Sequence, residues 1–436
     1  MTKHNILRKQ YILNEQNYQL KIPMELDVLI PENDSVRLIS QFVEEMDLTA
    51  LYDTYERMPS EKYASPEIML KVMLYAYHEA KDISSGSIEK NCMRDIDYKY
   101  LLEGRAAPDH AAIARFRTKH FAKCAQSFLA QMSRILYELD QLTTSEVFID
   151  GTKIEAAANK YTFVWKRAVS RHRARFSRKT ALLVGDIIQR YDLKPLWQKQ
   201  VRKKHVKKLL KTLKTLARRQ GLEFVCGRGH RKEQLQRDIE DLEAAFEKIR
   251  EYELKIHKCG MRNSYSKTDN DATFMHMKDD HMMNGQLKPA FNVQHAVDSG
   301  FIVSVGIFPD PTDVLTLKPF VENMESNLNM KFERIVADAG YESEENLTCL
   351  KEKGIAAYIK PGNYEQIGTR KFSKEIGRKE NMMYDAEHDC YICCNGKAVK
   401  KTGSRKVKTA SGYIREETHY YCEECDGCPH RAKCLE

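Results

Sequence analysis

Hydrophobic residues recur at helical spacing through the first third of the chain. Ser65, Pro66 and Glu67 form a helix-start signature, and the apolar residues after them recur about every 3.6 positions. A second pattern of this kind starts at Pro108 and Asp109, where Asp109 suits an N-cap, and continues to about residue 139. We therefore expect residues 1–140 to form a mostly helical N-terminal domain.

Two apolar stripes predict paired helices between residues 166 and 256. The first stripe lies on a very basic segment, and the second follows the 4-3-4-3 spacing of a coiled-coil seam. The stretch between them, GLEFVCGRGHRKE, holds three glycines and suits a loop. We expect an antiparallel helical hairpin, inserted into another domain. The stripes consist of Val206, Leu209, Leu210, Leu213 and Leu216, and of Leu235, Ile239, Leu242, Phe246 and Ile249.

Strand patterns replace the helical ones after this insertion. LKPAFNVQHAV and FIVSVGIFP flank Asp298-Ser299-Gly300 and predict a β-hairpin with a short loop. The apolar run 147–149, before the insertion, predicts a first strand. The order of these elements predicts a mixed α/β sheet over residues 141–365. The later elements are a helix (314–328), a strand (332–338), a helix (344–354) and a short strand (355–361).

The composition fits a folded globular protein of two or three domains. The chain has 436 residues, of which 42% are hydrophobic, enough for a sizeable core. It contains no run of about 18 apolar residues, and its N-terminal sequence MTKHNILRKQYILNEQ is polar, without a signal-peptide pattern. We therefore expect a cytoplasmic location.

The positive charge is concentrated in one segment. Between Lys166 and Arg219 there are 19 Lys and Arg residues against 2 acids, whereas the whole chain has a net charge of +9. A basic segment on an otherwise acidic body favours a polyanionic partner, with nucleic acid first and a membrane surface second. A solvated helix face is the alternative that the charges alone leave open.

Seven of the twelve cysteines lie between Cys390 and Cys434. In a cytosolic chain such clustering indicates metal binding before disulfides, and five of these thiols have the spacing C-x28-C-x2-C-x2-C-x5-C, which suits tetrahedral Zn²⁺. This set has one thiol too many, and Cys390, Cys394 and His430 are further candidates, so the four ligands stay open, as does the alternative of unligated thiols. We expect a small zinc-ribbon-like module at residues 366–436. The five spaced thiols are Cys393, Cys422, Cys425, Cys428 and Cys434.

Two acids follow apolar runs of the same form. VFIDGT has Asp150 after one run, and IVADAG has Asp338 after another. Adjacent strands that end at one edge of a sheet would bring these carboxylates together, where a cation between them relieves their repulsion. Mg²⁺ needs only one or two carboxylates besides substrate phosphates, and two such ions about 3.5–4 Å apart support phosphodiester chemistry. A turn or cap is the alternative role for either acid alone.

The order of these motifs resembles that of DDE-type transposases of bacterial insertion sequences. The resemblance rests on FIDGTKIEAAANKYTFVWK, on YSKTDNDATFMHMKDDHMMNGQLKPAFNVQHAVDSGFIVSVGIFPDPTDVLTLKPFVE and on RIVADAGYESEENLTCL. SPEIMLKVMLYAY and PDHAAIARFR resemble an InsH-like N-terminal DNA-binding domain. The resemblance implies an RNase H-like catalytic domain with two Mg²⁺ or Mn²⁺ ions, in which Asp150 bridges both ions and Asp338 binds one. It also implies a cysteine-rich insertion with structural zinc, and a homodimer that pairs transposon terminal repeats on double-stranded DNA and joins them to target DNA.

The chain departs from this family at the third acid. The resemblance implies a Glu on a helix after the cysteine-rich insertion, in a Tyr-Arg-Glu-like pattern. Glu365 and Glu436 are acids in this region, but neither lies in a matching motif. We therefore expect a C-terminally truncated chain with impaired activity. A non-catalytic DNA-binding fragment and a metal-dependent nuclease of the same fold are the alternatives.

Four further acids lie close to these motifs. Asp269 and Asp271 are in SKTDNDATFM, and Asp310 and Asp313 follow the expected hairpin. The resemblance suggests that Asp271 lies near the DNA or the active site. Capping and turn roles explain all four residues and are the preferred interpretation.

Overall fold

The computed structural model describes residues 26–56, 63–80, 82–194, 201–226, 231–277, 285–409 and 411–435. Glu436, one of the two acids considered for the third catalytic position, lies outside these residues. The contacts divide the chain into two compact units. One comprises Met1–Leu142 with Ser326–Asn329, and the other comprises Thr143–Glu325 with Met330–Glu436.

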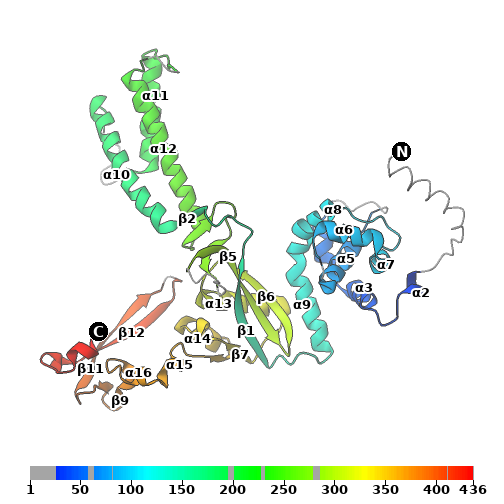
Figure 1. Cartoon of the computed structure of the whole chain (residues 1–436). Coiled ribbons are helices and arrows are strands. Elements are labelled where there is room, and N and C mark those ends of the chain that lie inside the picture. Colours follow the sequence, from blue (N-terminus) through cyan, green and yellow to red (C-terminus); the bar gives the residue numbers. More distant parts are fainter. Residues whose placement is uncertain are drawn as a thin grey trace, which may run out of the picture. The chain divides into compact units, whose positions relative to one another are not determined.

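The first unit is helical, as the apolar spacing predicts (Figure 1). The Ser65 hydroxyl caps the helix that follows it by accepting a hydrogen bond from Ile68 N at 3.2 Å. Asp109 is the predicted N-cap and accepts a hydrogen bond from Ala112 N at 2.6 Å. The elements are α2 (Leu26–Leu29), α3 (Ser35–Glu45), α4 (Thr49–Tyr52), α5 (Pro66–Glu79), α6 (Ser85–Arg94), α7 (Ile96–Leu101), α8 (His110–Arg115), the π-helical turn η1 (Phe116–Phe121) and α9 (Ala122–Glu138).

A lysine lies within the apolar core of this unit. Lys71 on α5 is 1% exposed, and its Nζ is 2.6 Å from a carboxylate oxygen of Glu44 and 3.1 Å from one of Glu103. Burial acts to lower the pKa of Lys71, but hydrogen bonds to these two carboxylates raise it above its ordinary value. The ammonium is tolerated inside the core because both carboxylates compensate its desolvation.

The second unit is built on a six-stranded mixed sheet. Its strands are β1 (Glu146–Glu155), β4 (Thr273–His276), β5 (Leu287–Asp298), β6 (Phe301–Phe308), β7 (Arg334–Ala337) and β8 (Ala356–Ile359). The spatial order is β4-β5-β1-β7-β8, with β6 also paired to β5. β1 is antiparallel to β5 and parallel to β7, which is parallel to β8. The predicted hairpin is confirmed, since β5 and β6 are joined by Ser299 and Gly300, both with positive φ as a tight hairpin loop requires.

β1 continues past Asp150, where the sequence had indicated a strand end. The ladder to β5 runs without interruption from Phe148 to Glu155, so the turn interpretation of Asp150-Gly151 is wrong. Only the parallel ladder to β7 stops here, at the pair Ile149 and Ala337. At Asp150, β1 is therefore still paired with β5 on one side. On its other side the pairing with β7 has just ended.

Two helices connect the later strands, as predicted. They are α13 (Leu317–Leu328) and α14 (Glu344–Glu352), preceded by the short 3₁₀ turns η2 (Asp313–Leu315) and η3 (Ala339–Tyr341). Phe320 of α13 is buried and packs edge-on against Phe308 of β6, with ring centroids 6.2 Å apart. A Cβ on Gly306 would lie 2.7 Å from both of these rings, so this glycine permits the close approach of α13 to the sheet.

Replacing Gly306 with alanine is expected to destabilise the second unit. The added methyl group has to displace two packed aromatic rings, and overpacking of this kind costs about 1–3 kcal/mol. Gly185→Ala is the matched control, because nothing lies within 4 Å of its Cβ position and alanine favours a helix. Thermal unfolding of the two variants measures the difference, and equal melting temperatures would contradict the packing argument.

The insertion between β1 and β4 is a helical arm (Figure 1). The predicted hairpin is present as α11 (Lys203–Arg219) and α12 (Gln234–Cys259), whose stripes share one apolar core. The sequence interpretation did not separate a third helix, α10 (Lys166–Arg190), which adds Val184 and Ile187 to that core. The described residues of the arm thus form three helices. Both of its ends join a two-stranded ribbon, β2 (Phe163–Trp165) paired with β3 (Ser264–Ser266).

An ion pair between exposed Arg190 and buried Asp238 connects α10 to α12 within the arm. Asp238, 2% exposed, accepts hydrogen bonds from Arg190 Nη1 at 2.5 and 2.6 Å and from the Tyr191 hydroxyl at 2.8 Å. Burial acts to raise the pKa of Asp238, but hydrogen bonds from Arg190, Tyr191 and Gln234 hold it below its ordinary value. The end of α10 is therefore fixed to α12, whereas most of its first fourteen residues are exposed or half-buried.

The C-terminal segment forms a small antiparallel sheet of its own. It contains β9 (Met383–Asp385), β10 (Cys390–Ile392), β11 (Ala398–Lys408) and β12 (Ile414–Tyr421), in the order β12-β11-β10-β9. Short helical turns flank this sheet, namely α15 (Tyr364–Ile367), α16 (Arg370–Ser373), η4 (Lys379–Asn381), η5 (Glu423–Cys425) and α17 (Arg431–Cys434). Within the residues that the structure describes, no helix of either unit has the length and apolar character needed to cross a membrane.

Candidate active site and basic arm

Asp150 and Asp338 lie at the same level of two neighbouring parallel strands. The last pair of the β1–β7 ladder is Ile149 opposite Ala337, and each acid is the next residue along its strand. Both side chains are exposed. Asp150 also lies opposite His295 in the antiparallel ladder to β5. The strand register thus places the two acids side by side where the β1–β7 ladder ends, although β1 itself continues beyond Asp150.

Each of these carboxylates is oriented by a main-chain donor. Asp150 Oδ1 accepts a hydrogen bond from Gly151 N at 2.7 Å, and Asp338 Oδ1 accepts one from Gly340 N at 2.8 Å. Asp338 is also the N-cap of η3, so its position follows from the turn after β7. The remaining carboxylate oxygens can serve as ligands for a hard cation.

Asp313 is a third acid in this region, and sequence reasoning had preferred a turn or cap role for it. Its Oδ1 instead accepts hydrogen bonds from Asn292 Nδ2 at 2.8 Å and Gln294 Nε2 at 3.0 Å, both on β5. The signal that would have revealed it is topological. β6 runs in the same direction as β1, because both are antiparallel to β5. A residue shortly after the end of β6 can therefore return to the edge at which Asp150 lies.

The pKa of Tyr341 reflects the negative charge of this region. The residue is fully buried, and its hydroxyl donates a hydrogen bond to Gln294 Oε1. Burial raises the pKa of Tyr341 strongly, and the nearby carboxylates of Asp313, Asp150 and Asp338 raise it further. One phenol thus senses all three acids, so they belong to one electrostatic environment.

Of the other acids considered from the sequence, Asp269 has a clear structural role. Asp269 accepts hydrogen bonds from the main-chain N–H groups of Asp271 and Ala272, as a turn-capping residue does. Asp271 is exposed, and its carbonyl accepts a hydrogen bond from Arg262. Burial raises the pKa of Asp310, although the charge of Arg262 opposes this shift. The turn interpretation thus describes Asp269 well.

The predicted zinc ligands follow the strands of the small sheet along the chain. Cys393 follows β10, Cys422 follows β12, and Cys425 and Cys428 lie in the turns after it. A hydrogen bond to the Cys422 thiol raises the pKa of Cys425, together with burial and the nearby thiols of Cys422, Cys428 and Cys434. Every cysteine is a free thiol. Among the described residues, no three His, Cys, Asp or Glu side chains converge as the ligands of one metal ion do.

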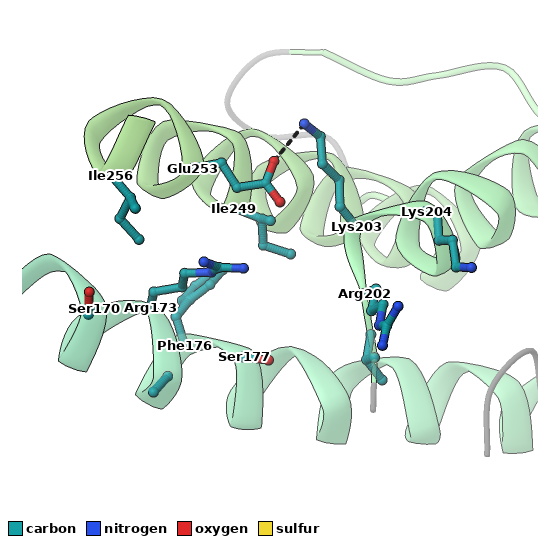
Figure 2. Close-up of a pocket in the computed structure, with 12 residues that line it drawn as sticks. Ser170, Arg173, Phe176, Ser177, Arg202, Lys203, Lys204, Ile249, Glu253 and Ile256 are labelled. Carbon is teal, nitrogen blue, oxygen red and sulfur yellow. Dashed lines mark hydrogen bonds and ion pairs between the residues drawn. The ribbon is translucent and has the colours of Figure 1, made fainter. Parts of the chain in front are cut away.

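The arm carries a cleft with a basic rim and an apolar floor (Figure 2). Its volume is about 460 Å³, and it lies between the first half of α10, the start of α11 and the end of α12. Arg173, Arg202 and Lys204 are exposed at this cleft. Lys203 is paired with Glu253, with 2.8 Å between Nζ and the carboxylate. The floor consists of Phe176, Ile249 and Ile256.

Exposed bases also continue along both helices outside the cleft. On α10 they recur on one face, and on α11 they surround the apolar stripe that faces α12. This distribution concentrates positive charge on the outside of the arm, where it can attract a polyanion. The exposed bases are Arg167, Arg171, Arg175, Arg178 and Lys179 on α10, and Lys207, Lys208, Lys211, Lys214, Arg218 and Arg219 on α11.

Comparison with protein families decides the identity of the chain. Residues 24–119 match the model of a Transposase domain (DUF772), and residues 262–415 match that of a Transposase DDE domain. The chain belongs to the DDE-type transposases of insertion sequences. The mixed sheet of this transposase, with helices after β6 and β7, is accordingly an RNase H-like fold.

The two family matches do not include β1, the arm or the last cysteines of the transposase. The match to the DDE domain includes Asp338, Asp313 and Cys393, but it begins after β1 and the arm and ends before Cys422. Comparison with curated proteins and with solved structures gives no match. The family is known to use divalent metal ions and to act on DNA. The individual roles of residues in this transposase therefore have to be argued from its own geometry.

Proposed function

We propose that this transposase binds the terminal repeats of its insertion sequence and catalyses metal-dependent cleavage and transfer of the DNA strand. Water would first attack the phosphodiester at the transposon end, and the freed 3′-hydroxyl would then attack target DNA in the bacterial nucleoid. The observation that carries the proposal is the register of β1 and β7, where Asp150 and Asp338 follow the paired residues Ile149 and Ala337.

The donor set at this edge fits Mg²⁺ or Mn²⁺. Asp150 and Asp338 are exposed carboxylates, each oriented by one main-chain N–H, and such oxygen ligands suit a hard cation that keeps positions for substrate phosphates. When bound, the ions stabilise the attacking and leaving oxygens of the phosphodiester. The protein supplies two fixed carboxylates where the β1–β7 ladder ends, so they need little rearrangement to bind a cation.

The third carboxylate of the family pattern bears on the expected rate. Within the 436 residues no acid lies in the Tyr-Arg-Glu-like pattern, and Glu365 is instead paired with Lys360 at 2.7 Å, on a turn that precedes the cysteine-rich segment. We therefore propose that these residues bind DNA and divalent metal but turn over slowly. The basic arm favours a second candidate function, a DNA-binding transposase fragment that occupies transposon ends without cutting them.

An end-cleavage assay separates these functions. The full chain is mixed with duplexes that carry the terminal repeats, with and without Mg²⁺, and both mobility shifts and strand nicks are followed. We expect a mobility shift from binding of the repeats, and slow metal-dependent nicking at the repeat ends. Binding without nicking favours the DNA-binding fragment, and nicking of any duplex regardless of its ends favours a metal-dependent nuclease. Transposases of this kind would pair two ends as a homodimer.

We also propose that the C-terminal module binds one structural Zn²⁺. A hydrogen bond to Cys422 raises the pKa of Cys425 and burial raises that of Cys434, and the charges of neighbouring thiols add to both shifts. A soft cation bound by these thiolates would relieve the repulsion between them. Cys393 and Cys394 are among the thiols near Cys434, whereas Cys390 lies within strand β10. The support is thus strongest for ligands from Cys393, Cys422, Cys425, Cys428 and Cys434.

Replacing Cys425 with serine is expected to remove this zinc. The purified full chain should contain about one zinc per chain, as a closed structural site does, and the variant should contain almost none. Cys226→Ser is the matched control, because Cys226 is an exposed thiol of the arm and should leave the zinc content unchanged. Metal analysis by mass spectrometry measures both, and zinc-free wild-type protein after purification without chelators would contradict the proposal.

A further inference from the structure

We propose that Asp313 is a third carboxylate of the catalytic metal site and binds a divalent cation together with Asp338. This inference rests on the proposed function of the site and extends it to a residue outside the two strand-end acids. The observations that support it are the anchoring of Asp313 to β5, the close approach of two glycines, and the position of Asp313 relative to Asp338.

The side chain of Asp313 is anchored by buried amides. Asn292 and Gln294 are 1% and 0% exposed, and both donate a hydrogen bond to Asp313 Oδ1. Gln294 Nε2 also donates to Asn292 Oδ1 at 3.0 Å, and Gln294 Oε1 accepts the hydroxyl of Tyr341. The amides are therefore held in one orientation, with their N–H groups directed at the carboxylate. Such donors stabilise a carboxylate in its charged form and fix its direction.

If Asp313 only fastened the loop after β6 to the sheet, its Oδ1, which accepts both amide hydrogen bonds, would be sufficient. The second oxygen of Asp313 has a different environment. Oδ2 lies 3.3 Å from the position that a Cβ on Gly340 would take, and Asp338 Oδ1 lies 3.0 Å from the same position. Carboxylate oxygens of both acids thus border one small space next to the main chain. Two like charges in such proximity favour a cation between them.

Glycine allows the chain to come close to this space at two main-chain positions. A Cβ on Gly151 would lie 2.5 Å from Gln294 Nε2 and 2.8 Å from Asp313 Oδ1, so any side chain there would displace the anchored carboxylate. Gly151 directly follows Asp150, and Gly340 is two residues after Asp338. The glycines after both strand-end acids therefore make room for Asp313. This explains the small-residue turns in VFIDGT and IVADAG without a hairpin at either place.

The test is the affinity of the full chain for Mn²⁺, measured by titration calorimetry and by the electron paramagnetic resonance signal of the free ion. Asp313→Asn keeps an oxygen that can accept the two amide hydrogen bonds, but it removes the charge near Asp338. We expect Mn²⁺ affinity at least about 10-fold weaker, as for the loss of groups that support a metal site. Asp313→Glu keeps the charge and should retain more affinity than the asparagine variant.

Asp310→Asn is the matched control, since Asp310 lies in the same loop and has no part in the proposed site. It should bind Mn²⁺ like the wild type. Wild-type affinity in Asp313→Asn, together with a lowered melting temperature of the metal-free protein, would mean that Asp313 is only a structural anchor and would overturn the inference. If Asp338→Asn also binds Mn²⁺ like the wild type, the proposed function of the site fails as well, so the two failures can be told apart.

Discussion

Replacing Asp150 with alanine is expected to abolish the Mg²⁺-dependent cleavage of terminal-repeat DNA. Asp150 is the acid proposed to contact both metal ions, and metal ions contribute several kcal/mol of transition-state stabilisation, which is roughly a 10³-fold change in rate. Because the side chain is exposed and accepts a hydrogen bond from the adjacent Gly151 N, its removal should leave the sheet intact. Single-turnover nicking of an end-labelled duplex measures the loss.

The matched control for Asp150 is Glu155, the last residue of the same strand. Glu155→Gln breaks an ion pair with Lys288, in which Nζ and the carboxylate are 2.7 Å apart, and exposed pairs of this kind contribute little to stability. Its cleavage rate should therefore equal that of the wild type. Asp150→Ala protein that still nicks the repeat ends at the wild-type rate would show that the site has been assigned to the wrong residues.

Removing the positive charge of α10 is expected to weaken DNA binding in a salt-dependent way. Arg167, Arg171, Arg175 and Arg178 are exposed and follow one face of the helix. Each base that neutralises a phosphate contributes about 1 to the slope of log K against log salt concentration. Replacing all four with glutamine should thus flatten this slope by up to about 4. Fluorescence anisotropy with a labelled duplex at several salt concentrations measures it.

Strand β11 offers a control of equal charge for this experiment. Lys400, Arg405, Lys406 and Lys408 are exposed there, and their replacement by glutamine removes the same net charge from another part of the chain. If both quadruple variants lose the same affinity, overall charge is responsible and the arm is not a specific DNA contact. A variant in which Asn-Gly replaces residues 167–262 should bind duplex DNA at least about 100-fold more weakly at moderate salt.

Much of the fold follows from periodicity and turn chemistry. The apolar spacing predicted α5, α13 and α14, and the loop residues after Asp298 predicted the hairpin of β5 and β6. These features are local, so the sequence carries them directly. The burial of Lys71, in contrast, could not be predicted from local spacing. This residue occupies a polar place in the pattern of α5, but Glu44 and Glu103, distant in sequence, allow it to be buried.

The candidate site was predictable only in part, for a similar reason. Asp150 and Asp338 share a local pattern, an acid after an apolar run, so the sequence singles them out. Asp313 has no such pattern. Its role depends on Asn292 and Gln294 of β5, which belong to a strand whose pairing with β1 is not encoded locally. The same pairing carries β1 through Asp150 and Gly151, where a dipeptide preference alone predicted a turn.

The ribbon of β2 and β3 has a consequence for how such a transposase can diversify. Trp165 and Ser264 are paired across it, so the chain leaves for the arm and returns from it at adjacent points. An arm of any length can begin and end there without a change in the strand order of the sheet. A longer, shorter or differently charged arm is therefore compatible with the same sheet, and the strands that hold the acids stay as they are.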